Sequence, residues 1–234
     1  MSAVTPTCLV AITGGSGAGK TWLTARLARH WGASAACLAQ DDFYRDQSHQ
    51  LPAQRSRVNF DDPAALDWPE FRACLQALRA GRDTDRPAYD FHTHARRPDR
   101  PAVEARTVVF VEGLWLCHDP AVRELFHYRV YLRCPAELRL ARRLARDVAE
   151  RGRTSAGVRR QFRQTVEPMH MKYVEPQAEW ADVVIDSPCP DAIIAAIHQA
   201  VRDRLAAGAK ATPAPRRAAV EAFPPILGAI PTFS

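Results

Sequence analysis

The segment LVAITGGSGAGKTW, residues 9–22, decides the fold class of this chain. An apolar run is followed by the complete pattern G-x-x-x-x-G-K-[S/T], from Gly14 to Thr21, and then by a helical pattern. Glycines let successive backbone N–H groups converge on a phosphate, and the N-terminus of the following helix adds partial positive charge. We therefore predict a P-loop between a strand and a helix. The alternative, a glycine-rich turn that merely joins the two elements, would need neither Lys20 nor Thr21.

The P-loop pattern predicts roles for individual residues. Lys20 is expected to reach the β- and γ-phosphate oxygens of ATP, and the Thr21 hydroxyl is expected to bind Mg²⁺. Only three of the 32 Lys and Arg residues are lysines, so Lys20 supplies a compact ammonium group in a chain that elsewhere uses arginine. The residues predicted to bind ATP in this loop are Gly14, Gly15, Ser16, Gly17, Ala18, Gly19, Lys20 and Thr21.

The composition is that of one globular domain with a tail. The 234 residues are 47% hydrophobic and 25% charged, and no apolar run approaches the ~20 residues that cross a bilayer. We predict one domain over residues 1–206. Residues 207–234 are rich in Ala, Pro and Arg, so we predict a disordered tail there.

The cysteines and the start of the chain indicate a reducing compartment. The N-terminus has no basic segment ahead of its apolar run, so no secretory signal is expected. No C-x-x-C pair occurs, and most cysteines lie in apolar segments. We expect a cytoplasmic protein with buried free thiols, and neither disulfides nor a zinc site. The cysteines are Cys8, Cys37, Cys74, Cys117, Cys134 and Cys189.

Alternating strand and helix patterns predict the rest of the fold. Continuous apolar runs are typical of strands that are covered on both faces. Their order predicts an α/β fold with a mostly parallel sheet, helices on both faces, and ligands bound at the C-terminal ends of the strands. Residues 82–101 are expected to form an irregular or hairpin excursion beside the site. The predicted strands are 7–13, 34–40, 107–113, 128–134 and 181–186, and the predicted helices are 20–31, 69–80, 119–126, 135–150, 155–166 and 190–206.

Two of the predicted strands end in carboxylates. Asp41 follows the second strand, beside the P-loop in a parallel sheet, where it could orient and deprotonate a substrate hydroxyl. A turn or N-cap aspartate is the alternative, and the adjacent Asp42 is the better candidate for that structural role. Glu112 ends the third strand, where it could hold Mg²⁺ directly or through water; a buried glutamate paired with an arginine is the alternative.

An arginine-rich segment, residues 138–162, runs through a glycine-containing turn. We interpret it as a lid, about residues 150–165, whose arginines close over phosphates and exclude water. A solvated basic face is one alternative. A nucleic-acid surface would suit the net charge of +6, but no aromatic residues interleave with these arginines to stack on bases. One face of the predicted helix carries Arg139, Arg143 and Arg146, and another carries the apolar stripe of Leu140, Leu144 and Val148.

Taken together, the motifs resemble the uridine kinase family of P-loop nucleoside kinases, over residues 11–186. Besides GGSGAGKT and QDDFY (40–44), five segments match the family's order and have similar spacing. They are NFDDPAALD (59–67), PAYDFHTH (87–94), VVFVEGLW (108–115), RRLARDVAERGR (142–153) and ADVVI (181–185). The resemblance implies a P-loop kinase fold with a helical arginine-bearing lid. It also implies ATP- and Mg²⁺-dependent phosphorylation of the 5′-hydroxyl of uridine, and of cytidine, in pyrimidine salvage.

The resemblance also implies roles for residues in these segments. Asp41 would be the base for the ribose 5′-hydroxyl, and Arg146 and Arg151 would contact the triphosphate. The implied catalytic residues are Asp41, Lys20 and Arg146, and the implied metal-binding residues are Thr21 and Glu112. Asp61 would hold the ribose hydroxyls, while Tyr89 and His94 would contact the pyrimidine. A packed aromatic residue and a loop histidine are the plain alternatives for that last pair. The implied nucleoside-binding residues are Asp61, Tyr89, His94, Arg143, Arg153 and Gln161.

Three positions depart from the family's pattern. Asp62 stands where the family usually has histidine, Trp22 where serine or threonine is common, and DSPCPD (186–191) where it has a glycine-containing segment. QDDF and MHMKY (169–173) also resemble nicotinamide riboside kinases, so another small hydroxyl compound is an alternative acceptor. An ATP-binding regulator without kinase activity is a third hypothesis. The expected partner is a small-molecule nucleoside, with neither nucleic acid nor membrane, and a homo-oligomer is left open.

Overall fold

The computed structural model describes residues 7–55 and 58–208. Most of the predicted tail, residues 209–234, lies outside the described residues. Within the described ranges, no helix is long and apolar enough to cross a membrane.

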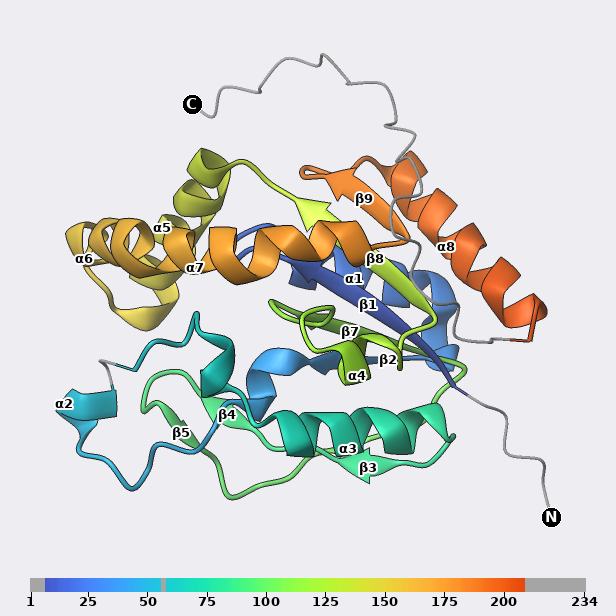
Figure 1. The fold of residues 1–234 in the computed structure, drawn as a ribbon, viewed down its shortest axis with the longest axis horizontal. Coiled ribbons are helices and arrows are strands. Elements are labelled where there is room, and N and C mark those ends of the chain that lie inside the picture. Colours follow the sequence, from blue (N-terminus) through green and yellow to red (C-terminus); the bar gives the residue numbers. More distant parts are fainter. Residues whose placement is uncertain (1–6, 56–57, 209–234) are drawn as a thin grey trace.

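A five-stranded parallel sheet forms the centre of the molecule (Figure 1). Its strand order is β2-β7-β1-β8-β9, so β1 pairs with β7 on one side and with β8 on the other. This parallel sheet confirms the predicted α/β fold, and each of its strands lies within two residues of its predicted bounds. The strands are β1 (Cys8–Gly14), β2 (Ala35–Ala39), β7 (Val108–Gly113), β8 (Tyr128–Arg133) and β9 (Val183–Asp186).

Helices cover both faces of the sheet, as predicted. The side chains of Leu9 and Ala11 belong to the apolar cluster on the α3 face, whereas Val10 and Ile12 belong to the cluster that includes α1 and α8. Alternate residues of one strand therefore fill two cores, because successive side chains of a strand point to opposite faces. These helices are α1 (Lys20–Trp31), α3 (Trp68–Arg79) and α8 (Asp191–Ala206).

Short elements form the excursion that was predicted beside the sheet. Two antiparallel ribbons, β3 with β6 and β4 with β5, lie on the α3 side in Figure 1. The helix predicted over 119–126 is shorter, because only its first turn is helical. The elements are α2 (Pro52–Arg55), β3 (Thr84–Asp85), β4 (Tyr89–Asp90), β5 (Ala95–Arg96), β6 (Ala102–Val103) and α4 (Pro120–Arg123).

A helical region lies beyond the C-terminal ends of the strands (Figure 1). It contains α5 (Ala136–Arg151), α6 (Ser155–Gln161) and α7 (Glu167–Met169). Wide π-helical turns at 162–166 and 170–174 flank α7, and a 3₁₀ turn at 175–180 follows. The helix predicted over 155–166 continues past residue 166 in further helical segments, so the predicted end is wrong. Pro168 and Pro176 each lie in the first turn of their helical segments, a position that proline tolerates.

All six cysteines are free thiols. Five of them are buried, but Cys37 is exposed, which corrects the expectation of buried thiols at that position. The physical reason is topology, since Cys37 lies in β2, the edge strand of the sheet.

A buried ion pair joins β8 to the turn before β9. Asp182 accepts hydrogen bonds from the backbone N–H and the Nε of Arg129 at 2.8 and 3.0 Å, and both side chains are nearly inaccessible. Arg204 of α8 contacts the same carboxylate. Removing one partner of such a pair leaves a buried charge uncompensated.

We expect Asp182→Ala to lower the free energy of unfolding by about 3 kcal/mol, the usual cost of breaking a buried pair. The matched control is Asp186→Ala. Its carboxylate is 80% exposed and lies 3.8 Å from Arg133, so the loss should stay within about 0.5 kcal/mol. Urea unfolding of both variants measures the difference, and equal losses would contradict the assignment.

Candidate active site

The P-loop connects β1 to α1 and has the strained backbone that its glycines allow. Gly17 has φ 81°, and a Cβ atom there would lie 2.5 Å from the carbonyl oxygen of Arg139. A Cβ on Gly15 would lie 2.8 Å from Nδ1 of His170. The loop is therefore packed against α5 and the turn after α7, and larger residues at either position would displace it.

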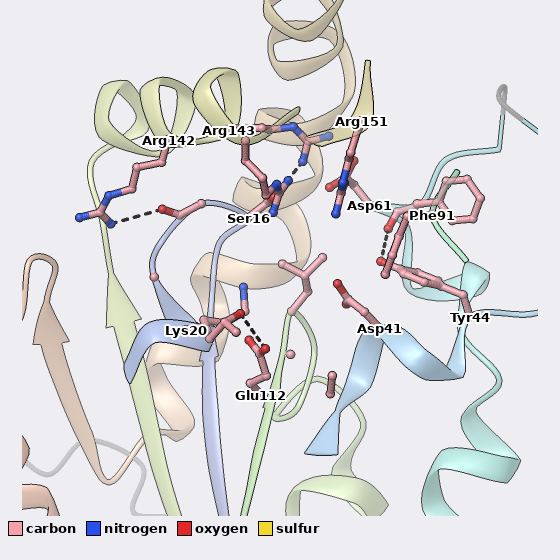
Figure 2. Close-up of a pocket in the computed structure, with 18 of the residues that line it drawn as sticks. Ser16, Lys20, Asp41, Tyr44, Asp61, Phe91, Glu112, Arg142, Arg143 and Arg151 are labelled. Atoms are coloured by element: carbon pink, nitrogen blue, oxygen red, sulfur yellow. Dashed lines mark hydrogen bonds between the residues drawn. The ribbon is translucent and has the colours of Figure 1, made fainter. Parts of the chain in front are cut away.

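Glu112 lies beside Lys20 at the start of α1 (Figure 2), and it also contacts Thr21, the next residue of that helix. The Thr21 hydroxyl donates to Glu112 Oε1 at 2.7 Å, and Lys20 Nζ donates to the Gly15 carbonyl at 3.0 Å. Burial lowers the pKa of Lys20, against the opposing effect of Glu112 and Asp41, and burial raises the pKa of Glu112. A hydroxyl and a carboxylate are oxygen ligands of the kind that Mg²⁺ prefers, so this pair fits the predicted metal site.

Two aspartates face the P-loop from the opposite side of the cavity. Asp41 lies in the 3₁₀ turn after β2, and Asp61 precedes another 3₁₀ turn, and both side chains line the cavity. Burial raises the pKa of Asp61, while the nearby Arg143 lowers it. The neighbouring Asp42 instead pairs with Arg86, which confirms the structural role predicted for it.

Aromatic side chains form the wall beside Asp61. Phe60 and His94 stack with their centroids 4.9 Å apart and their planes at 14°, and Phe91 and Tyr44 also line the cavity. Burial lowers the pKa of His94, and Arg153 and Arg151 add to the effect, so this histidine is neutral at pH 7. Tyr89 lies behind the wall, packed on Tyr44, Phe60 and Phe91.

A fully buried carboxylate organises the arginines. Asp147 lies on α5, and guanidinium groups approach it to 2.8–3.6 Å from four positions. Burial alone would raise the pKa of Asp147, but Arg146 and Arg143 outweigh it, and the net pKa is lowered. The four arginines are Arg143, Arg146, Arg151 and Arg153.

The buried face of α5 is the charged one. Arg139, Arg143 and Asp147 are buried, whereas Val148 of the predicted apolar stripe is 42% exposed. Leu140 and Leu144 are half-buried. Arg139 donates to Glu167 at 2.6 Å and to the Cys134 carbonyl, which makes its burial tolerable. The stripe and the arginines thus lie on different faces, as predicted, but the arginine face is the more buried one, because hydrogen bonds and ion pairs compensate its charges.

One cavity of about 340 Å³ brings most of the predicted site residues together (Figure 2). Gly14, Gly15 and Ala18 do not line it, and neither does Tyr89. The predicted residues that do line it are Ser16, Gly17, Gly19, Lys20, Thr21, Asp41, Asp61, His94, Glu112, Arg143, Arg146, Arg151, Arg153 and Gln161.

Other lining residues were missed by the sequence reasoning. Tyr44, Phe60 and Phe91 form the aromatic wall, yet each lies inside a segment quoted for its neighbours. Arg142 contacts the P-loop carbonyls of Ala18 and Gly17 from α5. Adjacency to Asp61 and Tyr89 was the signal that could have marked the aromatic residues. Among the described residues, there is no group of three His, Cys, Asp or Glu side chains that could hold a metal ion.

Comparison with known proteins agrees with this geometry. The family model described as "Phosphoribulokinase / Uridine kinase family" matches residues 9–193. The chain belongs to this family. The uridine kinase of Brevibacillus brevis is 39% identical over 178 residues, which cover 76% of this chain and 83% of the relative. The uridine kinase of Deinococcus deserti is 42% identical over 178 residues, covering 76% and 86%.

A solved structure of the same family supports the fold. Phosphoribulokinase from Rhodobacter spheroides superposes with a TM-score of 0.61 at 16% identity, covering 78% of this chain and 70% of that one. At this identity the likeness concerns the fold alone. The phosphoribulokinase/uridine kinase family membership and the P-loop kinase fold predicted from the motifs are both confirmed.

We expect Asp147→Asn in this family member to lower the free energy of unfolding by about 2 kcal/mol at pH 7, since four guanidinium groups lose their shared counter-charge. The pKa of Asp147 is lowered on folding. Its contribution is thus fully present above its unfolded pKa of about 3.9 and is lost as the pH falls through the folded value.

The difference between wild type and Asp147→Asn should be constant from pH 5 to 8 and should shrink below about pH 4. Urea unfolding across this range measures it. The matched control is Glu150→Gln, an exposed acidic residue on the same helix, which should show no such difference. A gap that widens on acidification would contradict the role given to Asp147.

Proposed function

We propose that this protein transfers the γ-phosphoryl group of ATP to the 5′-hydroxyl of uridine, and of cytidine, giving the nucleoside monophosphate and ADP. One observation carries the proposal. A single cavity joins a P-loop to a compartment lined by Asp41, Asp61 and stacked aromatic rings. Relatives at 39% and 42% identity that are named uridine kinase support this choice of acceptor.

The triphosphate end of the cavity has the groups that phosphoryl transfer requires. Lys20 would neutralise charge on the β- and γ-phosphates, and the backbone N–H groups of the loop would bind their oxygens. Thr21 and Glu112, 2.7 Å apart, would hold Mg²⁺. A cation held there would supply positive charge that offsets the charge developing on the phosphates.

Asp41 is the proposed base. It lines the cavity, and in Figure 2 its side chain lies between Lys20 of the P-loop and Tyr44. In the reaction its carboxylate would accept the proton of the 5′-hydroxyl as the oxygen bonds to the γ-phosphorus, while the bond to the β-phosphate oxygen breaks and ADP leaves. Asp42 cannot replace it, because Arg86 occupies that carboxylate.

The aromatic compartment suits a ribonucleoside. The Asp61 carboxylate can accept hydrogen bonds from vicinal ribose hydroxyls. The positive charge of the nearby Arg143 opposes the effect of burial on the pKa of Asp61 and so favours its carboxylate form. Neutral His94 has an unpartnered, buried Nδ1 that can hydrogen-bond the edge of a pyrimidine. Phe91 supplies an aromatic surface for the flat base.

The arginines of α5 and its C-terminal turn are proposed to stabilise charge on the transferring group. Asp147 holds four of them at the cavity, so their guanidinium groups need little rearrangement when phosphates bind. Arg146 and Arg151 are assigned to the triphosphate, and Arg153 with Gln161 to the nucleoside. This inward placement disfavours the nucleic-acid hypothesis, which needs arginines directed to solvent.

Of the two segments that suggested nicotinamide riboside, QDDF contributes Asp41 to the main cavity, whereas no residue of MHMKY lines it. His170 of MHMKY lies against Gly15 of the P-loop, and Tyr173 packs against His118. The alternative acceptor is therefore not favoured. A cytoplasmic location and a role in pyrimidine salvage remain part of the proposal, the first because all six cysteines are free thiols.

Asp41→Asn should lower kcat by about 10³-fold, within the ~10²–10⁴ that a positioned base contributes, while ATP still binds. Labelled phosphate transfer and calorimetric binding of ATP measure the two effects. The matched control is Asp42→Asn, which should weaken the fold through Arg86 but keep kcat within a few-fold. Near-normal turnover of Asp41→Asn would show that this residue is not the base.

An acceptor panel tests the substrate. Uridine and cytidine should accept labelled phosphate, whereas nicotinamide riboside should be a poor acceptor. Because Asp61 would lose one of its two hydroxyl partners, 2′-deoxyuridine should lose about 10²-fold or more in kcat/KM. No transfer to uridine or cytidine would refute the proposed function.

A further inference from the structure

A second cavity lies beside the P-loop, separate from the nucleoside compartment. Its volume is about 280 Å³ and its walls are mostly apolar. Gly19, Trp22 and Arg142 line both this cavity and the main one, so the two are continuous across the start of α1. Figure 2 shows Arg142 on the opposite side of the P-loop from Phe91 and Tyr44. The cavity therefore opens at the end of the site that is remote from the acceptor.

Trp22 is the unusual residue of this cavity. It is 48% exposed, which is rare for so large an apolar side chain, and it stands where the resemblance in sequence fails. Lys20 and Trp22 are two residues apart on a helix, so their side chains leave it roughly 200° apart. Trp22 lines both cavities, so its indole lies where the main cavity meets the apolar one.

Neighbouring residues hold the cavity in shape. Arg26 lies 5.4 Å from the Trp22 ring centroid and pairs with Asp191 at the start of α8. Across the cavity, Arg142 donates to the Ala18 carbonyl at 3.0 Å and to Ser187 Oγ at 2.9 Å. Trp22 is therefore linked to α8 through Arg26, and Arg142 on the opposite wall is linked to the P-loop.

The walls offer few groups that could identify the edge of a base. Besides Trp22, the side chains with nitrogen or oxygen atoms among the described lining residues are Arg142 and Ser187. These two hydrogen-bond each other, and Ser187 also hydrogen-bonds Cys134. The remaining side-chain walls come from Leu23, Leu132, Pro188 and Cys189. An apolar slot rejects ligands that differ in one polar group only weakly, whereas a hydrogen-bonding site rejects them strongly.

We propose that Trp22 is the stacking platform for the base of the nucleoside triphosphate donor. Stacking depends on the area and π-face of the base, which adenine and guanine share. The inference deepens the proposed function and rests on it for the reaction, but it concerns donor binding, which is measured without any nucleoside acceptor.

The test measures dissociation constants by calorimetry for ATP, GTP and inorganic tripolyphosphate, with Mg²⁺ and without acceptor. Trp22→Ala should weaken ATP and GTP by about tenfold, within the range for loss of one stacked base, and should leave tripolyphosphate unchanged. Trp22→Phe should retain most of the affinity.

The matched control is Met171→Ala, which removes an exposed apolar side chain that lies outside both cavities. It should bind all three ligands as wild type does. Trp22→Ala with unchanged ATP affinity would overturn the proposal, and so would equal weakening of ATP and tripolyphosphate, because the effect would then act on the phosphates. Absence of transfer to uridine would refute the proposed function and leave these binding results standing.

Discussion

The parallel register of β1 between β7 and β8 is the constraint on which the site depends. Ile12 pairs with Glu112 and Gly14 with Leu132, so three strand ends lie at one edge of the sheet. The P-loop, the metal-binding carboxylate and the segment leading to α5 all start from that edge. A slip of one residue would reverse every side chain of β1 and exchange the two cores it fills. The 2.7 Å contact between Thr21 and Glu112 follows from this register.

Charge, in place of apolar packing, holds the helical region onto that frame. Asp147 and its four arginines occupy the position where an amphipathic helix usually buries leucines. Arg143 extends the network, since it donates to Ser16 of the P-loop at 2.8 Å and to Gln161 at 3.0 Å. One guanidinium thus joins the phosphate loop, α5 and α6. Such a network is costly to bury but becomes useful when a phosphoryl group brings further negative charge.

The sequence predicted the sheet and the P-loop because both have local signatures. Continuous apolar runs located all five strands, and the spacing of Gly14, Gly19 and Lys20 located the loop. The buried face of α5 could not be predicted in this way. Leu140 and Leu144 form a convincing apolar stripe, and only the three-dimensional positions of the acceptors for Arg139 and Arg143 show why the charged face turns inward. Periodicity records hydrophobicity, not the partners that compensate a buried charge.

The donor side of the site, at the Trp22 cavity, could not be predicted from the sequence either. The motif located the phosphates, because backbone N–H groups and one lysine suffice to bind them. No comparable motif exists for a base that is held by stacking, since any aromatic ring at the correct place will serve. The role of Trp22 can be inferred only together with Arg142, Leu132 and Pro188, which line the same cavity and come from segments more than 100 residues away. Recognition by shape and π-surface is distributed along the chain, so a departure from a family's pattern becomes interpretable only when its neighbours in space are known.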